Sequence, residues 1–313
     1  MVEGEEGDND NNSKANNKLK KVKKENEPQY GDRYSGRSGV GGVWKYRPHV
    51  SAVCRIYSTS QTPSEITSVS YDGTVRSLDI DQQAFISRFS APSDLGDLWF
   101  TDAWEYGGGV RDISDSGSGN NKLFVSRSDG YACLIDFRQG SKGRGNSSYA
   151  WVADMGYKTQ SVQHFPTDEN LLLTACAGAG GDISLYDIRK LGGSSKKITE
   201  SVLSFNGHSK SINAAYASPD GKSIVSVCQD DTIRLWTNFQ SQSSSSKNDK
   251  NASSVTFSVT NHNNHTGRWL STFRPTWDPK FNASFVSGSM NKPRCIEYFS
   301  VNYATKEGAC VYL

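Results

Sequence analysis

Hydrophobic and polar positions alternate in short runs along most of the chain, and turns carrying Gly or Asp separate the runs. The run TVRSLDI (74–80) ends with Leu78 and Ile80 at alternate positions, the period of a β-strand. LLLTAC (171–176) is nearly continuously apolar, as is typical of a strand buried on both faces. No run of eighteen apolar residues exists, so we expect no membrane span. The pattern predicts an all-β fold built from many short strands.

The arrangement of apolar strand, turn and alternating strand repeats from about residue 43 onward. An aspartate recurs in the turns about every fifty residues, at Asp72, Asp129, Asp182 and Asp231. Polar insertions lengthen the units and are expected to form loops. The five recognisable units contain residues 66–80, 123–138, 171–189, 207–236 and 271–299.

The fourth unit carries the most specific signature. Gly207-His208 opens it, the turn Ser-Pro-Asp-Gly follows at 218–221, and Leu235-Trp236 closes it. This order resembles a WD repeat, which is one four-stranded blade of a β-propeller. The resemblance implies that His208, one of Asp230 or Asp231, and Trp236 form hydrogen bonds inside the blade. His208 is therefore expected to be structural.

We predict an all-β WD-repeat β-propeller over residues 43–313, with five recognisable blades. The expected ring is an incomplete form of about seven blades that lacks complete first and last blades. Residues 1–42 have too few apolar side chains to fold and are predicted to be a disordered tail, first acidic and then lysine-rich. The lysine cluster is typical of a nuclear localisation signal, and a solubilising tail is the alternative. Its members are Lys18, Lys20, Lys21, Lys23 and Lys24.

Enzymatic chemistry has no support in the sequence. None of the five histidines has a nucleophile or carboxylate partner at a recognisable spacing. His262 and His265 are close in sequence but lack a third ligand, and the six cysteines lack the spacing of a zinc site. We therefore predict no catalytic residue, no metal and no cofactor, and we expect a binding function. The formal net charge of +2 neither favours nor excludes a nucleic acid.

Two adjacent units end in the same short box. Asp136-Phe137-Arg138 and Asp187-Ile188-Arg189 each finish a strand with Asp-x-Arg. Such boxes on adjacent blades resemble those of the substrate receptors of cullin-4 ubiquitin ligases. The resemblance implies that Arg138 and Arg189 contact the damage-binding adaptor, with Asp136 and Asp187 beside them. The alternative is an ordinary exposed arginine after the third strand of a blade.

Four segments together resemble one family. They are KYRPHVSAV (45–53), SYDGTVRSLDI (70–80), GRWLSTFRPTWDP (267–279) and SGSMNKPRCIEYF (287–299). They are similar to WD repeat-containing protein 76 and its fungal relatives, the CMR-type DNA damage-binding proteins. The resemblance implies a nuclear protein that binds DNA, prefers damaged sites, associates with chromatin and is linked to cullin-4 ligases.

The residues around 265–274 are predicted to bind DNA at the rim of the propeller. Arg268, Arg274 and Lys210 would contact phosphates, and Trp269 would stack on an exposed base. Phe273 and Trp277 are instead assigned to packing. The alternatives are an inter-blade salt bridge for Arg268 and core filling for Trp269. The competing function is a general protein-interaction scaffold that does not bind DNA.

Overall fold

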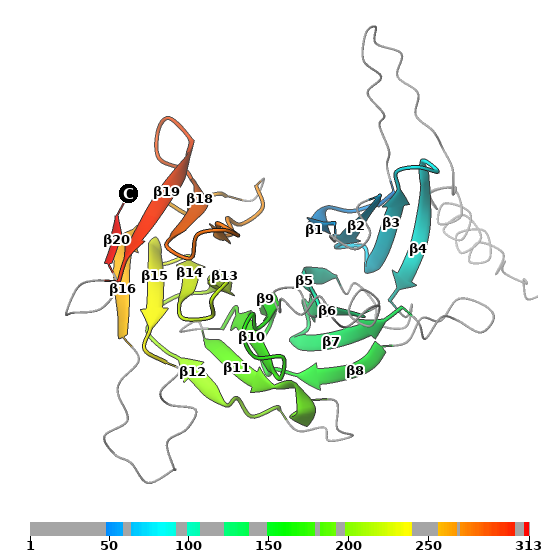
Figure 1. The fold of residues 1–313 in the computed structure, drawn as a ribbon, viewed down its shortest axis with the longest axis horizontal. Helices are drawn as coiled ribbons and strands as arrows, with labels where there is room; N and C mark the ends of the chain where they lie inside the picture. Colours follow the sequence, from blue (N-terminus) through cyan, green and yellow to red (C-terminus); the bar gives the residue numbers. More distant parts are fainter. Residues whose placement is uncertain are drawn as a thin grey trace, which may run out of the picture.

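The computed structural model describes residues 48–58, 64–91, 99–106, 122–137, 149–178, 182–191, 198–239, 256–267, 270–303 and 310–312. These residues form five antiparallel sheets of four strands each. Figure 1 shows the sheets side by side in an arc around a common centre. Each sheet contains one of the five repeat units, which confirms the predicted β-propeller architecture. We number these blades 1 to 5 in chain order.

The strands of each blade follow one another in sequence. In blade 1 they are β1 (Val53–Tyr57), β2 (Glu65–Ser70), β3 (Thr74–Asp79) and β4 (Ala84–Ser90). In blade 2 they are β5 (Phe100–Glu105), β6 (Lys122–Arg127), β7 (Tyr131–Asp136) and β8 (Tyr149–Asp154). In blade 3 they are β9 (Thr159–His164), β10 (Leu171–Cys176), β11 (Ile183–Asp187) and β12 (Leu203–Phe205), with a 3₁₀ turn η3 (Ile188–Lys190) after β11.

Blade 4 contains β13 (Ile212–Ala217), β14 (Ile224–Cys228), β15 (Thr232–Thr237) and β16 (Thr256–Asn261). Blade 5 contains β17 (Thr276–Trp277), β18 (Ser284–Ser289), β19 (Cys295–Asn302) and β20 (Cys310–Tyr312). The first strands of blades 1 to 4, which are β1, β5, β9 and β13, lie nearest the centre of the arc, and β9 contacts both β5 and β13 there. The innermost positions of successive blades are thus in contact with one another.

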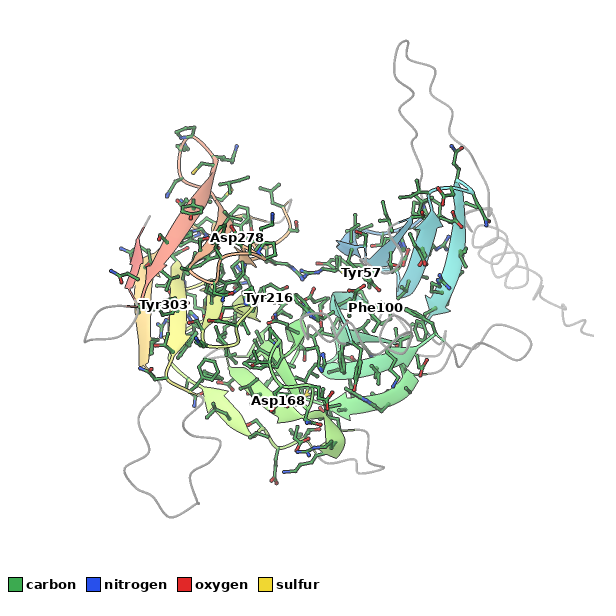
Figure 2. All side chains as sticks on the ribbon, in the orientation of Figure 1. Tyr57, Phe100, Asp168, Tyr216, Asp278 and Tyr303 are labelled. Atoms are coloured by element: carbon green, nitrogen blue, oxygen red, sulfur yellow. The ribbon has the colours of Figure 1, made fainter. Side chains whose placement is uncertain are left out.

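The apolar core lies between adjacent blades. One buried cluster fills each of the four junctions, because strands at the middle of a blade present apolar side chains to both neighbours. Strand β14 is buried at every position. The side chains in Figure 2 accordingly gather between the sheets.

Blade 4 contains the hydrogen-bonded network that a WD repeat implies. His208 Nδ1 lies 2.9 Å from Asp230 Oδ2, and His208 Nε2 lies 2.8 Å from Ser226 Oγ. The Trp236 indole also donates to Ser226 Oγ, at 2.8 Å. The sequence left Asp230 and Asp231 as alternatives, and the structure selects Asp230. His208 is fully buried in this network, as expected for a structural residue.

Blade 1 contains a shorter form of the same network. His49 Nδ1 lies 3.1 Å from Asp72 Oδ2, and His49 Nε2 lies 2.8 Å from Ser68 Oγ. In the strand register, Ser68 of β2 lies opposite Arg76 of β3, just as Ser226 of β14 lies opposite Arg234 of β15. Two residues further along the third strand, blade 1 has Leu78 where blade 4 has Trp236. The indole hydrogen bond is therefore absent from blade 1.

Candidate nucleic-acid interface

Each blade has two edges at which side chains can meet a ligand. At one edge, which we call the hairpin-turn edge, the second strand turns into the third. The turns at Asp72-Gly73, Asp129-Gly130, Asp230-Asp231 and 291–294 lie there. At the opposite edge, the third strand ends, as β7 does at Asp136 and β11 at Asp187. Loops and strand ends at these edges are the usual binding positions on such a scaffold.

Lys210 lies at the hairpin-turn edge of blade 4, and its side chain is exposed. Its position is fixed by the backbone, because its carbonyl accepts from the Cys228 thiol at 3.2 Å beside the β14–β15 turn. Lys292 and Arg294 lie in the β18–β19 turn at the same edge of blade 5 and are also exposed. Within the described ranges, these three cations form no ion pair. The structure thus places the predicted Lys210 in solvent and adds two cations to its edge.

The carboxylates of the hairpin-turn edge mostly face partners within the protein. Asp72 and Asp230 are buried against His49 and His208. Hydrogen bonds from Thr232 and His208 outweigh burial and lower the pKa of Asp230, which therefore stays ionised. Further along the edge, Arg127 holds Asp129 and His265 lies 3.2 Å from Asp231, while Asp182 is exposed.

Arg274 does not stand in solvent, so that part of the prediction is wrong. Its guanidinium forms an ion pair with Asp102, donates to Tyr216 Oη at 3.1 Å and donates to the Thr101 carbonyl at 2.5 Å. Burial alone would favour the neutral form, but the Asp102 carboxylate raises the pKa of Arg274. The physical reason is that Asp102 is fully buried and requires a counter-charge.

Asp102 connects several blades at the centre of the arc. It lies on β5 and accepts from the Val162 amide of β9 at 3.1 Å and from Tyr216 Oη of β13 at 2.8 Å. Through its ion pair with Arg274, Asp102 is also linked to the segment that leads into blade 5. Figure 2 shows Tyr216 on the side of its sheet that faces the centre. We call Asp102, Tyr216 and Arg274 the central cluster.

Residues 270–275, which precede β17, have no strand structure. Arg268 and Trp269 lie outside the described residues. Trp277 is 8 % exposed, and its indole donates to the Tyr216 carbonyl at 2.9 Å, which confirms its packing role. Phe273 is half-buried and lies against Gly288, where an added Cβ would meet its ring at 2.7 Å.

Sequence comparisons agree with this architecture. The model of the family described as "WD domain, G-beta repeat" matches residues 199–237, which include most of blade 4. WD repeat-containing protein 76 of Xenopus laevis is 33% identical over 264 residues, covering 84% of this chain and 40% of the relative. DNA damage-binding protein cmr1 of Aspergillus oryzae is 23% identical over 253 residues, covering 79% of this chain and 44% of the relative. DNA damage-binding protein 2 of Oryza sativa is 24% identical over 262 residues, covering 80% and 40%.

The chain thus carries a WD repeat in blade 4 and is similar over most of its length to WD repeat-containing protein 76 and to DNA damage-binding protein cmr1. It spans about 40% of the length of the curated relatives it matches. Among the described residues, no helix is long and apolar enough to cross a membrane.

The second predicted site lies on the opposite edge from Lys210. Asp136 and Asp187 end the third strands of adjacent blades, so their boxes share one edge. Arg189 has 70% of its side chain exposed, while Nε and Nη2 donate to Asp187 at 2.9 and 2.8 Å. This fork lowers the pKa of Asp187 and fixes the guanidinium at the surface. Arg138 lies outside the described residues.

The histidines considered as metal ligands have carboxylate partners. His262 Nδ1 lies 2.8 Å from Glu297 Oε2, and His265 Nε2 lies 3.2 Å from Asp231 Oδ2. In the described parts of the chain, the donor atoms of His208, Cys228 and Asp230 lie within 4.8 Å of one another. That group belongs to the WD network, and burial raises the pKa of Cys228 to about 12, which disfavours the thiolate that a metal requires.

The central cluster generates the first prediction. Replacement Arg274→Ala leaves the Asp102 charge buried without its counter-charge and should lower the free energy of unfolding by about 3–5 kcal/mol. Arg274→Lys should recover only part of this, because an ammonium lacks the planar fork of a guanidinium. Urea unfolding followed by tryptophan fluorescence measures both. Arg189→Ala, on the exposed edge, is the control, and a loss for Arg274→Ala below about 1 kcal/mol would contradict the role of the cluster.

Proposed function

We propose that the chain is a non-enzymatic WD-repeat scaffold that acts in the nucleus and binds DNA, preferentially damaged DNA, along its hairpin-turn edge. The observation that carries this proposal is the position of Lys210, Lys292 and Arg294, three exposed cations on one edge of two adjacent blades. The names of the cmr1 relatives and of DNA damage-binding protein 2 support the same activity.

Electrostatics favours a phosphate backbone as the ligand of these cations. Lysine and arginine supply most phosphate contacts in protein–DNA complexes, and such contacts position the protein without reading sequence. The three cations are exposed. At the same edge, Asp72 and Asp230 are buried against histidines, Asp129 pairs with Arg127 and Asp231 with His265, and Asp182 of blade 3 is exposed. The edge can thus attract a polyanion although the net charge of the chain is only +2.

Preference for damaged DNA requires a group that recognises unpaired bases. Trp269 is our candidate, because an aromatic ring can stack on a base that has left the duplex. Gly267, two residues before Trp269, lines the same surface depression as Lys210, so the chain leaves the hairpin-turn edge just before Trp269. Arg268 would add a phosphate contact beside it.

A second function, presentation of targets to a cullin-4 ligase, is favoured by Arg189. The Asp187 carboxylate holds its guanidinium at the edge opposite Lys210. A protein that binds DNA at one edge and the damage-binding adaptor at the other could hold both together. If only this second edge is active, the chain is a protein-interaction scaffold.

DNA binding is tested by the triple change Lys210→Ala, Lys292→Ala and Arg294→Ala. We expect weaker binding to every DNA sequence, because each lost phosphate contact reduces the salt dependence of log K by about one unit of slope. Fluorescence anisotropy over a salt series measures affinity and slope. Trp269→Ala should instead cost ~1–3 kcal/mol, mainly on DNA with unpaired bases.

Arg189→Ala is the matched control for that experiment, because it removes an exposed cation from the opposite edge. It should retain the affinity and the salt slope of the unchanged protein. Equal losses for the triple variant and the control would indicate nonspecific attraction, and an unaffected triple variant would remove the proposed DNA edge.

Adaptor binding is tested by Arg138→Ala combined with Arg189→Ala. We expect this variant to lose co-precipitation of the cullin-4 damage-binding adaptor, because both changes remove planar donors from one edge. The triple variant of the DNA edge should still capture the adaptor. Full capture by a folded double-arginine variant would reject the ligase role.

Nuclear targeting is tested in the lysine cluster, which lies outside the described residues. Replacing Lys18, Lys20, Lys21, Lys23 and Lys24 with Ala in a fluorescent fusion should reduce nuclear enrichment, because import signals are read as clusters of positive charge. Imaging of cells measures the ratio of nuclear to cytoplasmic signal. Replacement of the same lysines by Arg keeps the charge and should restore enrichment, and an unchanged ratio in the Ala variant would refute the assignment.

A further inference from the structure

The chain segments that lead into β5, β9 and β13 meet the hairpin-turn edge side by side. Strands β9 and β13 are neighbours, because the Ala215 amide donates to Ser161 Oγ at 3.0 Å. Strands β5 and β9 are neighbours as well, because Thr101 Oγ1 donates to the Thr159 carbonyl at 2.5 Å. The residues just before these three strands therefore form one continuous stretch of the edge.

Two exposed aromatic side chains stand in this stretch. Trp99, just before β5, is 37% exposed, and Tyr157, two residues before β9, is 59% exposed. The other exposed aromatic side chains of the described residues lie away from the hairpin-turn edge, at Phe257, Phe281, Tyr298 and Tyr303. The two aromatic rings thus belong to the same edge as Lys210.

The backbone holds both aromatic residues in place. The Ser128 amide, in the β6–β7 turn, donates to the Trp99 carbonyl at 3.0 Å, and the Trp99 amide donates to Ser128 Oγ at 3.3 Å. Gly156 turns the chain ahead of Tyr157 with a φ of 81°, and its amide donates to Asp154 Oδ1 at 2.8 Å. Both rings are therefore presented at fixed positions before a ligand arrives.

Tyr157 and Trp99 are also supported by neighbouring residues of blade 3. Gly178 lies against the Tyr157 ring, where an added Cβ would stand 3.5 Å from Cγ. Lys158 Nζ lies 5.5 Å from the centre of the Trp99 ring, a cation–π contact. The Lys158 backbone is fixed by the Ala177 amide, which donates to its carbonyl at 2.7 Å. One cation thus stands beside the two exposed rings.

We propose that Tyr157 and Trp99 form a stacking platform for unpaired bases of DNA, with Lys158 contacting the adjacent phosphate. This inference rests on the proposed DNA-binding function and names the described residues that would recognise an unpaired base. An aromatic ring stacks on any base, because every base has a π-face. A lysine beside the ring supplies the positive charge that a neighbouring phosphate requires.

Lys210 connects the platform to the cations of the proposed DNA edge. It lies two residues before β13, and Tyr157 lies two residues before the neighbouring strand β9. A DNA strand whose phosphates contact Lys210 therefore passes the Tyr157 ring, where a base that has left the duplex can stack.

The charges around the platform favour a base over a cationic ligand such as a methylated lysine. A cationic ligand would bring a second positive charge to the Trp99 ring, where Lys158 already stands. Asp182, ahead of β11 at the same edge, is exposed and balances the charge of Lys158. Discrimination between paired and unpaired DNA would therefore come from stacking, with little contribution from net charge.

The test compares a fully paired duplex with the same duplex carrying a short bubble of unpaired thymidines. In fluorescence anisotropy, Tyr157→Ala should weaken binding to the bubble about fivefold to hundredfold, because a base loses its stacking partner. Its affinity for the duplex and its salt slope should be unchanged, since no phosphate contact is removed. Tyr157→Phe keeps the ring and should bind the bubble normally.

Phe281→Ala is the matched control, because it removes an exposed aromatic ring from the opposite edge. It should bind the duplex and the bubble as the unchanged protein does. Circular dichroism checks that each variant is folded, as expected for the exposed Tyr157.

Photo-crosslinking gives a second measurement that needs no substitution. With 5-iododeoxyuridine in the bubble, near-ultraviolet irradiation of the complex should link the base to Tyr157 or Trp99, and mass spectrometry of the digested complex locates the link. Crosslinks found exclusively at other residues would overturn the platform even if Tyr157→Ala failed to fold.

The platform would also be overturned by an unchanged bubble affinity in folded Tyr157→Ala, by equal losses on duplex and bubble, or by an equal loss in Phe281→Ala. In each of these cases the unchanged protein still binds DNA, so the proposed DNA edge would stand. If the unchanged protein binds neither the duplex nor the bubble, the proposed DNA-binding function itself fails, and the platform fails with it.

Discussion

The buried carboxylate of Asp102 is the constraint on which the centre of the fold depends. A charge without exposure is stable only when ionic and hydrogen-bonding partners surround it. Asp102 obtains them from three other elements: Val162 of β9, Tyr216 of β13 and Arg274 ahead of β17. One side chain of blade 2 thus links blades 3 and 4 and the approach to blade 5. The apolar clusters hold each blade to its neighbour, and this polar cluster holds several blades to one centre.

That arrangement decides where ligands can bind. Arg274 is paired with Asp102 inside the fold, so it is not available to a partner. The exposed cations named above lie in turns and at the ends of strands. Exposed cations occur at both edges: Lys210, Lys292 and Arg294 lie at one, and Arg189, Lys190, Lys222 and Lys280 lie at the other. Since the body of each blade separates these edges, a ligand at one leaves the other accessible. Such a geometry suits a scaffold that brings two partners together.

Local sequence patterns predicted the blades well, because strand period and turn chemistry act over a few residues. The Gly-His start, the turn aspartate and Trp236 are sufficient to predict the network of blade 4 from the sequence. The central cluster was not predictable in this way, because Arg274 and Asp102 are 172 positions apart and nothing local marks them as partners. Arg274 was therefore misread as a solvent-exposed cation. Lys292 and Arg294 lie in the segment 287–299, which carries part of the family resemblance, but the sequence alone did not assign them to the DNA-binding edge.

The adjacent residues Asp230 and Asp231 show how the structural and candidate binding features of blade 4 are connected. Asp230 points into the blade, where it bonds His208 and fixes the β14–β15 turn. This leaves Asp231 at a positive φ on the same turn, where it accepts from the Asn264 amide and pairs with His265. The wall of the surface depression beside Lys210 is thus held by the network that stabilises the blade. A change that loosens Asp230 would therefore displace Asp231 and Asn264 as well, because one turn positions both carboxylates.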